Sequence, residues 1–153
     1  MRSDARATAL VLAGSGALLG GALAFQYLGG LVPCEMCLWQ RWPHVAALVL
    51  GLLAWRFRND RRVVGLAAVV LLGGAGLAAY HVGVEYHWWQ GPTACSASAT
   101  HGSLADITRQ VLAMPLVFCD AAAWRLFGIS MAGYNALFSL VIGASALWLT
   151  SRR

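Results

Sequence analysis

The sequence predicts an all-α membrane protein, a four-transmembrane-helix bundle with both termini cytoplasmic, formed as a single domain over residues 1–153. Two observations carry this prediction. Hydrophobic residues make up 59% of the chain and charged residues only 11%, whereas soluble domains carry about a quarter charged residues. The apolar residues also gather into four long runs. Together these features exclude a water-soluble globule and a disordered chain.

The four apolar runs cover approximately residues 7–28, 34–56, 63–84 and 127–150. Each is long enough to cross about 30 Å of hydrocarbon at about 1.5 Å per helical residue. Because an open-ended segment in lipid must satisfy its own backbone hydrogen bonds, we expect helices rather than strands. Gly16 and Gly20 form a GxxxG spacing, which either brings two helices together or reflects the abundance of glycine in membrane helices.

The arginines predict the orientation of these spans. Eight of the 11 basic residues fall on one side of a four-span topology, namely Arg2, Arg6, Arg56, Arg58, Arg61, Arg62, Arg152 and Arg153. By the positive-inside rule this side is cytoplasmic, so the net charge of +5 indicates topology rather than a nucleic-acid partner. The outward loops then cover about residues 29–38 and 85–126. The triplet at residues 22–24 is similar to a signal-peptide cleavage site, but the apolar run is longer than a signal-peptide core, which favours an uncleaved span.

All four cysteines fall on the outward side: Cys34 and Cys37 in a CxxC motif, and Cys95 and Cys119 in the long loop. Disulfides persist outside the cytosol, so an even number of cysteines there predicts two redox pairs. Two inert structural disulfides are an alternative, although CxxC is typical of redox motifs. A zinc site of four thiolates is another alternative, disfavoured by the wide spacing of the second pair.

The second span carries the CxxC motif at its start. A helix that began at Pro43 would offer about 13 residues before the next charge, too few to cross a membrane. We therefore expect a helix from near Pro33, with Pro43 kinking its interior. Cys34, Cys37 and Arg41 would share one face of this helix, where the helix N-terminus and Arg41 favour a thiolate. Arg41 is a candidate functional residue, with a snorkelling interfacial arginine as the alternative.

The long outer loop contains a predicted short interfacial helix. Ser103 and Asp106 form a capping-box pattern, and an apolar stripe follows at Leu104, Ile107, Val111 and Leu112. Such a stripe favours a helix that lies on the lipid surface rather than crossing it. His81 and His87, near the outer end of the third span, are the two histidines within reach of a bound cofactor, and neither is assigned a role.

Taken jointly, these motifs resemble the DsbB family, the disulfide bond formation proteins B of the bacterial inner membrane. The resemblance covers essentially the whole chain. It is carried by the segment Pro33-Cys34-Glu35-Met36-Cys37 with Gln40-Arg41, by residues 85–95, and by Cys119, Trp124, Gly128, Ser130 and Met131.

The resemblance implies a protein dithiol:quinone oxidoreductase. Cys95 would be attacked by a reduced periplasmic DsbA-type oxidase of thioredoxin fold, and Cys119 would pass the electrons to Cys34. Cys37 would then face a membrane quinone, either ubiquinone or menaquinone, with Arg41 binding its oxygen. The resemblance leaves the roles of His81, His87 and Glu85 open.

Two other functions are weighed against this expectation. One is a non-catalytic membrane assembly or metal-handling protein held by structural disulfides. The other is a vitamin K epoxide reductase-like quinone reductase, a related family with the same architecture. In that family the quinone-site CxxC lies late in the chain, whereas here it opens the second span.

Overall fold

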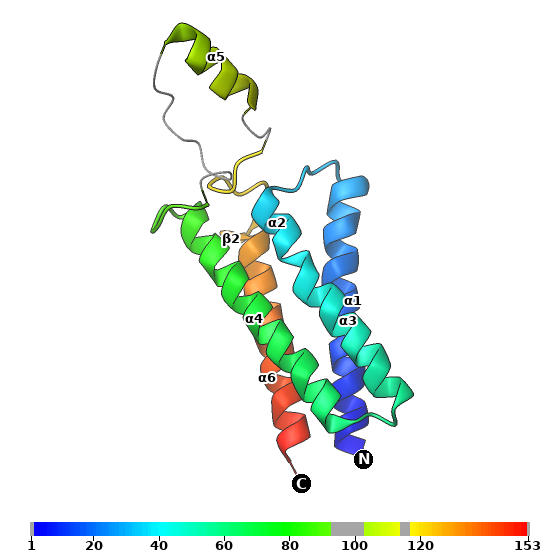
Figure 1. Cartoon of the computed structure of the whole chain (residues 1–153). Helices are drawn as coiled ribbons and strands as arrows, with labels where there is room; N and C mark the ends of the chain where they lie inside the picture. The colour runs from blue at the N-terminus through cyan, green and yellow to red at the C-terminus, as the bar shows by residue number, and fades with distance from the viewer. Residues whose placement is uncertain (1, 93–102, 114–116, 153) are drawn as a thin grey trace.

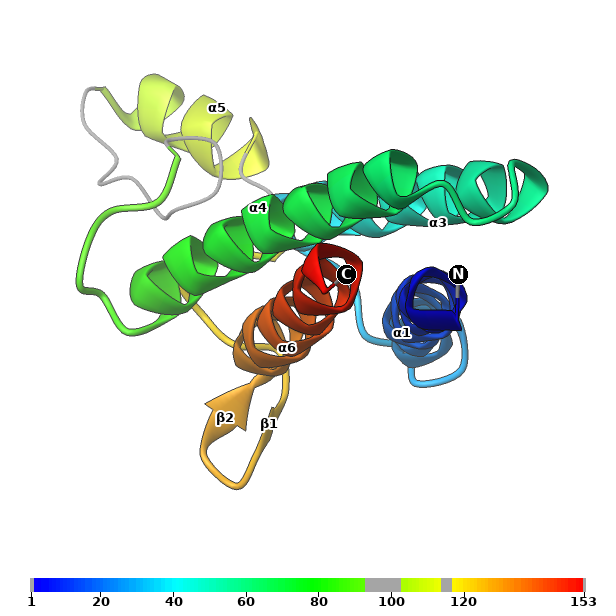
Figure 2. The same cartoon turned by 90° about the horizontal axis from the view of Figure 1, so that it is seen from below.

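The computed structural model describes residues 2–92, 103–113 and 117–152, and four long helices dominate these segments (Figure 1). They are α1 (Arg2–Tyr27), α3 (Arg41–Arg56), α4 (Arg61–Glu85) and α6 (Met131–Ser151). Helix α4 packs against α3 and α6, and α1 packs against the same two helices from the other side. The result is an up-and-down bundle, seen along its length in Figure 1 and from below in Figure 2.

Three helices of the described segments are long and apolar enough to cross a membrane: Asp4–Tyr27, Arg61–Glu85 and Met131–Ser151. Helix α3 has 16 residues and falls short of this length by itself. Large hydrophobic side chains are exposed on the outside of the bundle, such as Leu52 on α3, Leu66 on α4 and Val141 on α6. A surface of this kind is suited to lipid rather than water.

The kink that Pro43 was expected to cause within a helix over residues 34–56 is a full break, so the prediction of a single helix is wrong. The segment is divided into α2 (Glu35–Trp39) and α3, with Gln40 at the break. Pro43 is the physical reason, because its ring would clash with the carbonyl group four residues earlier in a continuous helix. In the structure Pro43 instead lies in the first turn of α3, where its missing N–H is not needed.

The fourth apolar run also begins later than expected, because α6 starts at Met131 and not at residue 127. Residues 125–130 form a β-hairpin of β1 (Arg125–Leu126) and β2 (Ile129–Ser130). Its turn residues Phe127 and Gly128 have φ values of 50° and 80°, which a two-residue hairpin turn requires. Ser130 then caps α6, since its Oγ accepts the N–H of Gly133 at 3.1 Å.

Small residues set the distances between helices. Gly74 of α4 lies against α3, and a Cβ placed there would be 2.7 Å from the Cβ of Pro43. By contrast, a Cβ at Gly20 would meet open space. The GxxxG spacing at Gly16 and Gly20 therefore does not mark a close helix contact, which favours the second of its two interpretations.

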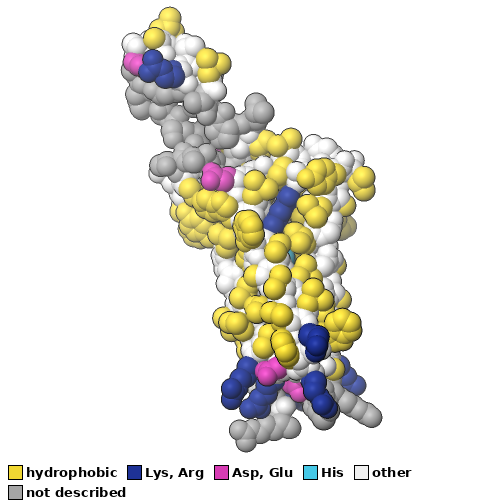
Figure 3. Space-filling model, turned by 45° about the vertical axis from the view of Figure 1, so that its right-hand side comes forward, with side chains coloured by type: hydrophobic (Ala, Val, Ile, Leu, Met, Phe, Trp, Pro, Cys, Tyr) yellow, Lys and Arg dark blue, Asp and Glu magenta, His cyan; other side chains and the backbone are white. Residues whose placement is uncertain are grey.

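Both termini and the α3–α4 turn lie at one end of the bundle (Figure 1). Arg56, Arg58, Arg61 and Arg62 belong to this turn and its flanks, and basic side chains gather at this end in Figure 3. The opposite end carries the CxxC motif, the hairpin and α5 (Leu104–Ala113).

Helix α5 confirms the predicted capping box. The Ser103 hydroxyl donates to Asp106 Oδ2 at 2.6 Å and accepts the Asp106 N–H at 3.3 Å. These hydrogen bonds lower the pKa of the Asp106 carboxyl below its ordinary value. Leu104 and Leu112 of the predicted stripe are strongly exposed.

Candidate functional site

The two cysteines of the CxxC motif lie side by side at the start of α2. Cys34 caps the helix, and its Sγ accepts the N–H of Cys37 at 3.2 Å. The two sulfur atoms are 2.6 Å apart and both residues are free thiols. Cys34 is buried at 5% exposure. Opening and closing a disulfide between them therefore needs little movement of the backbone.

Cys119 lies next to this pair. It is fully buried and disulfide-bonded, and it packs in one apolar cluster with Cys34, Met36 and Val84. Cys95, the other predicted redox cysteine of the loop, lies outside the described residues. The structure thus brings three of the four predicted cysteines to one place, at the end of the bundle opposite the two termini.

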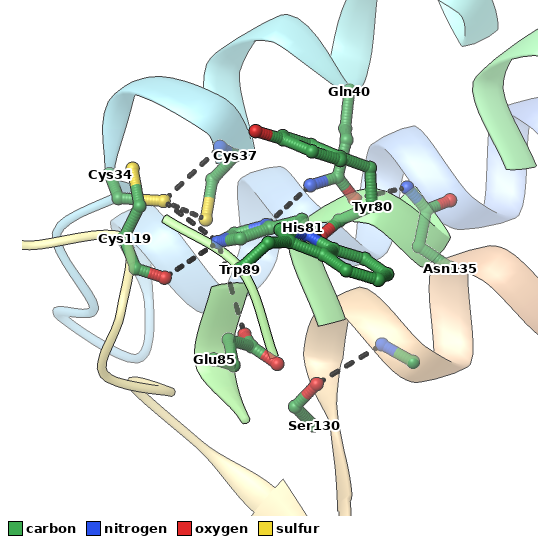
Figure 4. A network of polar contacts seen from close by, with 11 residues as sticks. Cys34, Cys37, Gln40, Tyr80, His81, Glu85, Trp89, Cys119, Ser130 and Asn135 are labelled. Carbon is green, nitrogen blue, oxygen red and sulfur yellow. Dashed lines mark hydrogen bonds and ion pairs between the residues drawn. The ribbon is translucent and has the colours of Figure 1, made fainter. Parts of the chain in front are cut away.

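His81 of α4 connects the two cysteine segments. Its Nε2 lies 3.7 Å from Cys34 Sγ and 3.2 Å from the carbonyl oxygen of Cys119. The carboxylate of Glu85, one helical turn along α4, is 4.0 Å from the same nitrogen. Figure 4 shows these groups gathered on one side of the imidazole ring. His81 is only 2% exposed, so water does not compete for these contacts.

A row of polar side chains continues from the other ring nitrogen of His81. Gln40 Nε2 lies 2.6 Å from His81 Nδ1, and Gln40 Oε1 accepts from Asn135 Nδ2 at 2.8 Å. Asn135 Oδ1 in turn contacts His44 Nε2 at 2.8 Å and accepts the Ser139 hydroxyl at 3.1 Å. This row joins α4, the α2–α3 junction, α6 and α3 inside the bundle, and Figure 4 shows its part from His81 through Gln40 to Asn135.

Arg41 occupies the first position of α3, in a different helix from the CxxC motif, and lines the same cavity as Cys34 and Cys37. Its Nη1 donates to Gln26 Oε1 of α1 at 2.6 Å. Its Nε is buried and has no hydrogen-bond partner among the described residues. A buried, unpaired cationic N–H is costly, so this atom marks a position where a ligand acceptor would be stabilised.

A cavity of about 350 Å³ is lined by most of these groups, while Cys119 and Ser139 lie outside its lining. Its polar lining includes Cys34, Cys37, Arg41, His44 and Glu85. The rest is mainly apolar, with aromatic side chains from α1, α6 and the segment before β1: Phe25, Trp124, Tyr134 and Phe138. An apolar cavity with a few directed polar groups is the usual form of a small-molecule site.

His81 and His87 were both expected near a cofactor, and the structure separates them. His81 and Glu85 line the cavity, whereas His87 is absent from its lining. His87 belongs to the turn after α4, where it adopts a φ of 57°. No motif in the sequence points to Gln26, His44 or Asn135 as functional residues. The sequence feature that identifies them is a polar side chain inside an apolar run, because such a residue in a membrane helix indicates function by default.

Metal binding has a candidate donor set within the described segments. The ligand atoms of Cys34, Cys37 and His81 lie within 4.8 Å of one another. Three such donors match part of a tetrahedral zinc site. However, the His81 nitrogen concerned already contacts the Cys119 carbonyl oxygen, and a metal would have to displace that contact.

The helix bundle and its site define a class: a membrane thiol–disulfide oxidoreductase, with a CxxC pair in the wall of an apolar cavity and a disulfide-bonded cysteine beside it. The chain belongs to the DsbB family, because the family model "Disulfide bond formation protein DsbB" matches residues 4–149. The resemblance stated from the motifs is thereby confirmed. Membership implies disulfide-generating oxidoreductase activity.

Several relatives carry the name "Disulfide bond formation protein B". The protein of Polaromonas naphthalenivorans is 31% identical, over 96% of this chain and 91% of its own length. The Azoarcus sp. protein is 30% identical, over 91% of this chain and 87% of its own. The protein of Burkholderia ambifaria is 30% identical, over 90% of this chain and 85% of its own length. No solved structure matches the chain significantly.

Proposed function

We propose that this protein reoxidises a periplasmic DsbA-type oxidase and passes the electrons through its two cysteine pairs to a membrane quinone. The observation that carries the proposal is the wall of the cavity. There the Cys34–Cys37 pair lies with Arg41, whose Nε has no partner among the described residues, and the disulfide-bonded Cys119 packs against Cys34 behind this wall. A thiol pair, a cation and an apolar pocket are the parts that such a reaction needs.

In this proposal the bundle crosses the bacterial inner membrane four times. Helices α1, α4 and α6 supply three spans, and α2 with α3 supplies the fourth, from Glu35 to Arg56. The arginine-rich end with both termini faces the cytoplasm by the positive-inside rule. The CxxC motif and α5 then face the periplasm, where disulfides persist.

The electrons enter at the loop pair. A thiolate of the reduced partner attacks Cys95 and breaks its bond to Cys119, which leaves as a thiolate. The Cys119 thiolate then attacks Cys34 and breaks the Cys34–Cys37 disulfide, so Cys37 becomes the thiolate. The partner's second thiol resolves the mixed disulfide and leaves as an oxidised protein. Two electrons and two protons have then moved from the partner into the site.

Two features of the cavity support a quinone as its ligand: the apolar, aromatic lining and the buried polar atoms without partners among the described residues. When bound, a quinone would supply the acceptor for two electrons and two protons, while Cys95 attacks Cys119 and the released Cys34 closes its disulfide with Cys37. Arg41 Nε offers a charged donor for a carbonyl oxygen, which gains negative charge during reduction. The buried Nδ1 of His44 also has no partner among the described residues and offers an acceptor for a hydroxyl group. The aromatic lining suits the ring and tail of ubiquinone and menaquinone alike.

Anaerobic quinone reduction by the purified, detergent-solubilised protein tests this proposal. A reduced DsbA-type oxidase supplies electrons, and the absorbance of a soluble quinone analogue is followed. We expect reduction by the unmodified protein and none by the Cys37→Ser variant. The Cys95→Ser variant should fail with the protein partner, yet still reduce quinone when a small dithiol reaches the CxxC pair directly.

Two outcomes would overturn the proposal. If no quinone is reduced by the unmodified protein with several oxidases and quinones, the non-catalytic alternative replaces it. If Cys95→Ser oxidises the protein partner at the full rate, the order of the cysteines is wrong. An Arg109→Met variant serves as the matched control, because this exposed arginine of α5 is far from the CxxC pair in the chain.

A further inference from the structure

In the row of polar side chains behind His81, every hydrogen bond has a defined donor and acceptor. The backbone carbonyl of Cys119 determines them. His81 Nε2 faces the carbonyl oxygen of Cys119 at 3.2 Å, and a carbonyl oxygen can only accept a hydrogen bond. Nε2 must therefore carry a hydrogen. A neutral imidazole has one N–H, so Nδ1 is an acceptor. Cys34 Sγ and Glu85 Oε1 also face Nε2 as acceptors.

The remaining members of the row follow from that one constraint. Gln40 must present its NH₂ group to His81 Nδ1, which leaves its oxygen to accept from Asn135. Asn135 then turns its own oxygen toward His44 and Ser139, both of which donate to it. Every amide in the row is oriented by its neighbour, and none can turn without breaking two hydrogen bonds.

We propose that Gln40 and Asn135 are positioning residues that hold His81 in the Nε2–H form, so that this N–H stabilises the thiolate of Cys34. The inference deepens the proposed function, since exchange between Cys34 and Cys119 is where such a thiolate forms. When the Cys95 thiolate attacks Cys119 and reforms the loop disulfide, the Cys34–Cys119 bond breaks and its electron pair stays on Cys34 Sγ. The proton stays on His81, which acts only as a hydrogen-bond donor.

Burial makes this donor necessary. Cys34 is 5% exposed, so water offers little stabilisation to a charge on its sulfur. The described residues provide two N–H groups within reach: the backbone N–H of Cys37 at 3.2 Å and His81 Nε2 at 3.7 Å. With the proton on Nδ1 instead, a bare nitrogen lone pair would face the sulfur and disfavour its negative charge.

An Asn135→Asp variant should exchange donor and acceptor in the hydrogen bonds from residue 135 through Gln40 to His81. A carboxylate cannot donate, so Gln40 would turn its NH₂ group toward residue 135 and its oxygen toward His81. His81 would then carry its proton on Nδ1. Nitrogen NMR of protein labelled with ¹⁵N-histidine distinguishes the two forms. The measurement is made on the full chain in detergent, without quinone or partner, and a His81→Gln variant assigns the signal.

The second readout is the reactivity of Cys34. In a Cys37→Ser background Cys34 is the free thiol of the site, and its alkylation rate reports its thiolate. We expect Asn135→Asp to slow alkylation by about tenfold, the usual worth of a hydrogen bond to a charged group. Ser139→Ala is the matched control, because it removes one hydrogen bond to Asn135 but leaves donor and acceptor unchanged in the other hydrogen bonds of the row.

Gln40→Glu provides an independent route to the same result, since it also presents only acceptors to His81 Nδ1. A thermal melt of each variant shows that it is folded. The inference is overturned if His81 of the unmodified protein carries its proton on Nδ1. It is also overturned if both folded variants keep the Nε2–H form and an unchanged alkylation rate. Because neither readout uses quinone, a missing quinone reductase activity would refute the proposed function and not this assignment.

Discussion

The imidazole of His81 is joined to the backbone of Cys119, with Nε2 3.2 Å from the carbonyl oxygen. This contact connects the middle of the chain to the segment before the hairpin, 38 residues further on. It holds a loop cysteine against the wall that also carries Cys34 and Cys37. The site therefore depends on α4 as much as on the helix that bears the CxxC motif.

The unpaired Nε of Arg41 leads to a prediction about quinone affinity. Arg41→Met removes the charged donor while keeping an unbranched side chain of similar length. We expect the apparent affinity for a quinone analogue to fall by about tenfold, since hydrogen bonds to charged groups contribute about 1.5–3 kcal/mol. The apparent affinity is measured as the KM from initial rates of quinone reduction at varied quinone concentration. An unchanged KM, with Arg109→Met as the control, would remove Arg41 from the site.

The close approach of Gly74 to Pro43 predicts a strong dependence of stability on this glycine. A Cβ at residue 74 would lie 2.7 Å from Pro43 Cβ, and a proline ring cannot rotate away. Gly74→Ala should therefore separate α3 from α4 and destabilise the bundle by about 1–3 kcal/mol, the usual cost of overpacking. A thermal melt in detergent measures this change.

The adjacent Gly73 offers the matched control for that measurement. A Cβ there meets nothing within 4 Å, and alanine favours a helix over glycine. Gly73→Ala should leave the melting temperature equal or higher. Equal melting temperatures for the two variants would show that the contact between Gly74 and Pro43 does not limit helix packing.

The capping box of α5 predicts how that helix responds to pH. Hydrogen bonds from Ser103 lower the pKa of Asp106 in the folded state, so the cap stabilises α5 above the unfolded pKa. This contribution is lost as the pH falls through the folded pKa. Ser103→Ala should raise the Asp106 pKa toward its ordinary value, measured by carbon NMR of the carboxyl group. Identical titrations in both proteins would contradict the cap.

Zinc analysis separates the redox function from the metal-handling alternative. The donors of Cys34, Cys37 and His81 lie close enough for a metal, yet a disulfide consumes two of them during turnover. We expect the oxidised protein to contain substoichiometric zinc and to keep its melting temperature when treated with a chelator. One tightly held zinc per chain, with unfolding on chelation, would favour the alternative.

Much of this protein follows from local sequence features. Helices α1 and α4 span the first and third apolar runs because long apolar segments leave the backbone no other partners in lipid. The break at Gln40 was harder to predict, since a proline permits either a kink or a new helix start. The hairpin before α6 was also missed, because Phe127 and Ile129 extend the apolar run and conceal the turn.

The site divides in the same way. Its CxxC pair, Arg41 and the family itself are evident in the sequence, because they depend on residues that lie within one short segment or on the pattern of the whole chain. The tertiary structure decided that Cys119 and His81 meet that pair, and that Asn135 is connected to His81 through Gln40. These residues are brought together by side-to-side packing of α3, α4 and α6, and contacts between distant segments leave no periodic signal in any one helix. That packing alone determines which buried polar groups pair, and which atoms of Arg41 and His44 have no partner among the described residues.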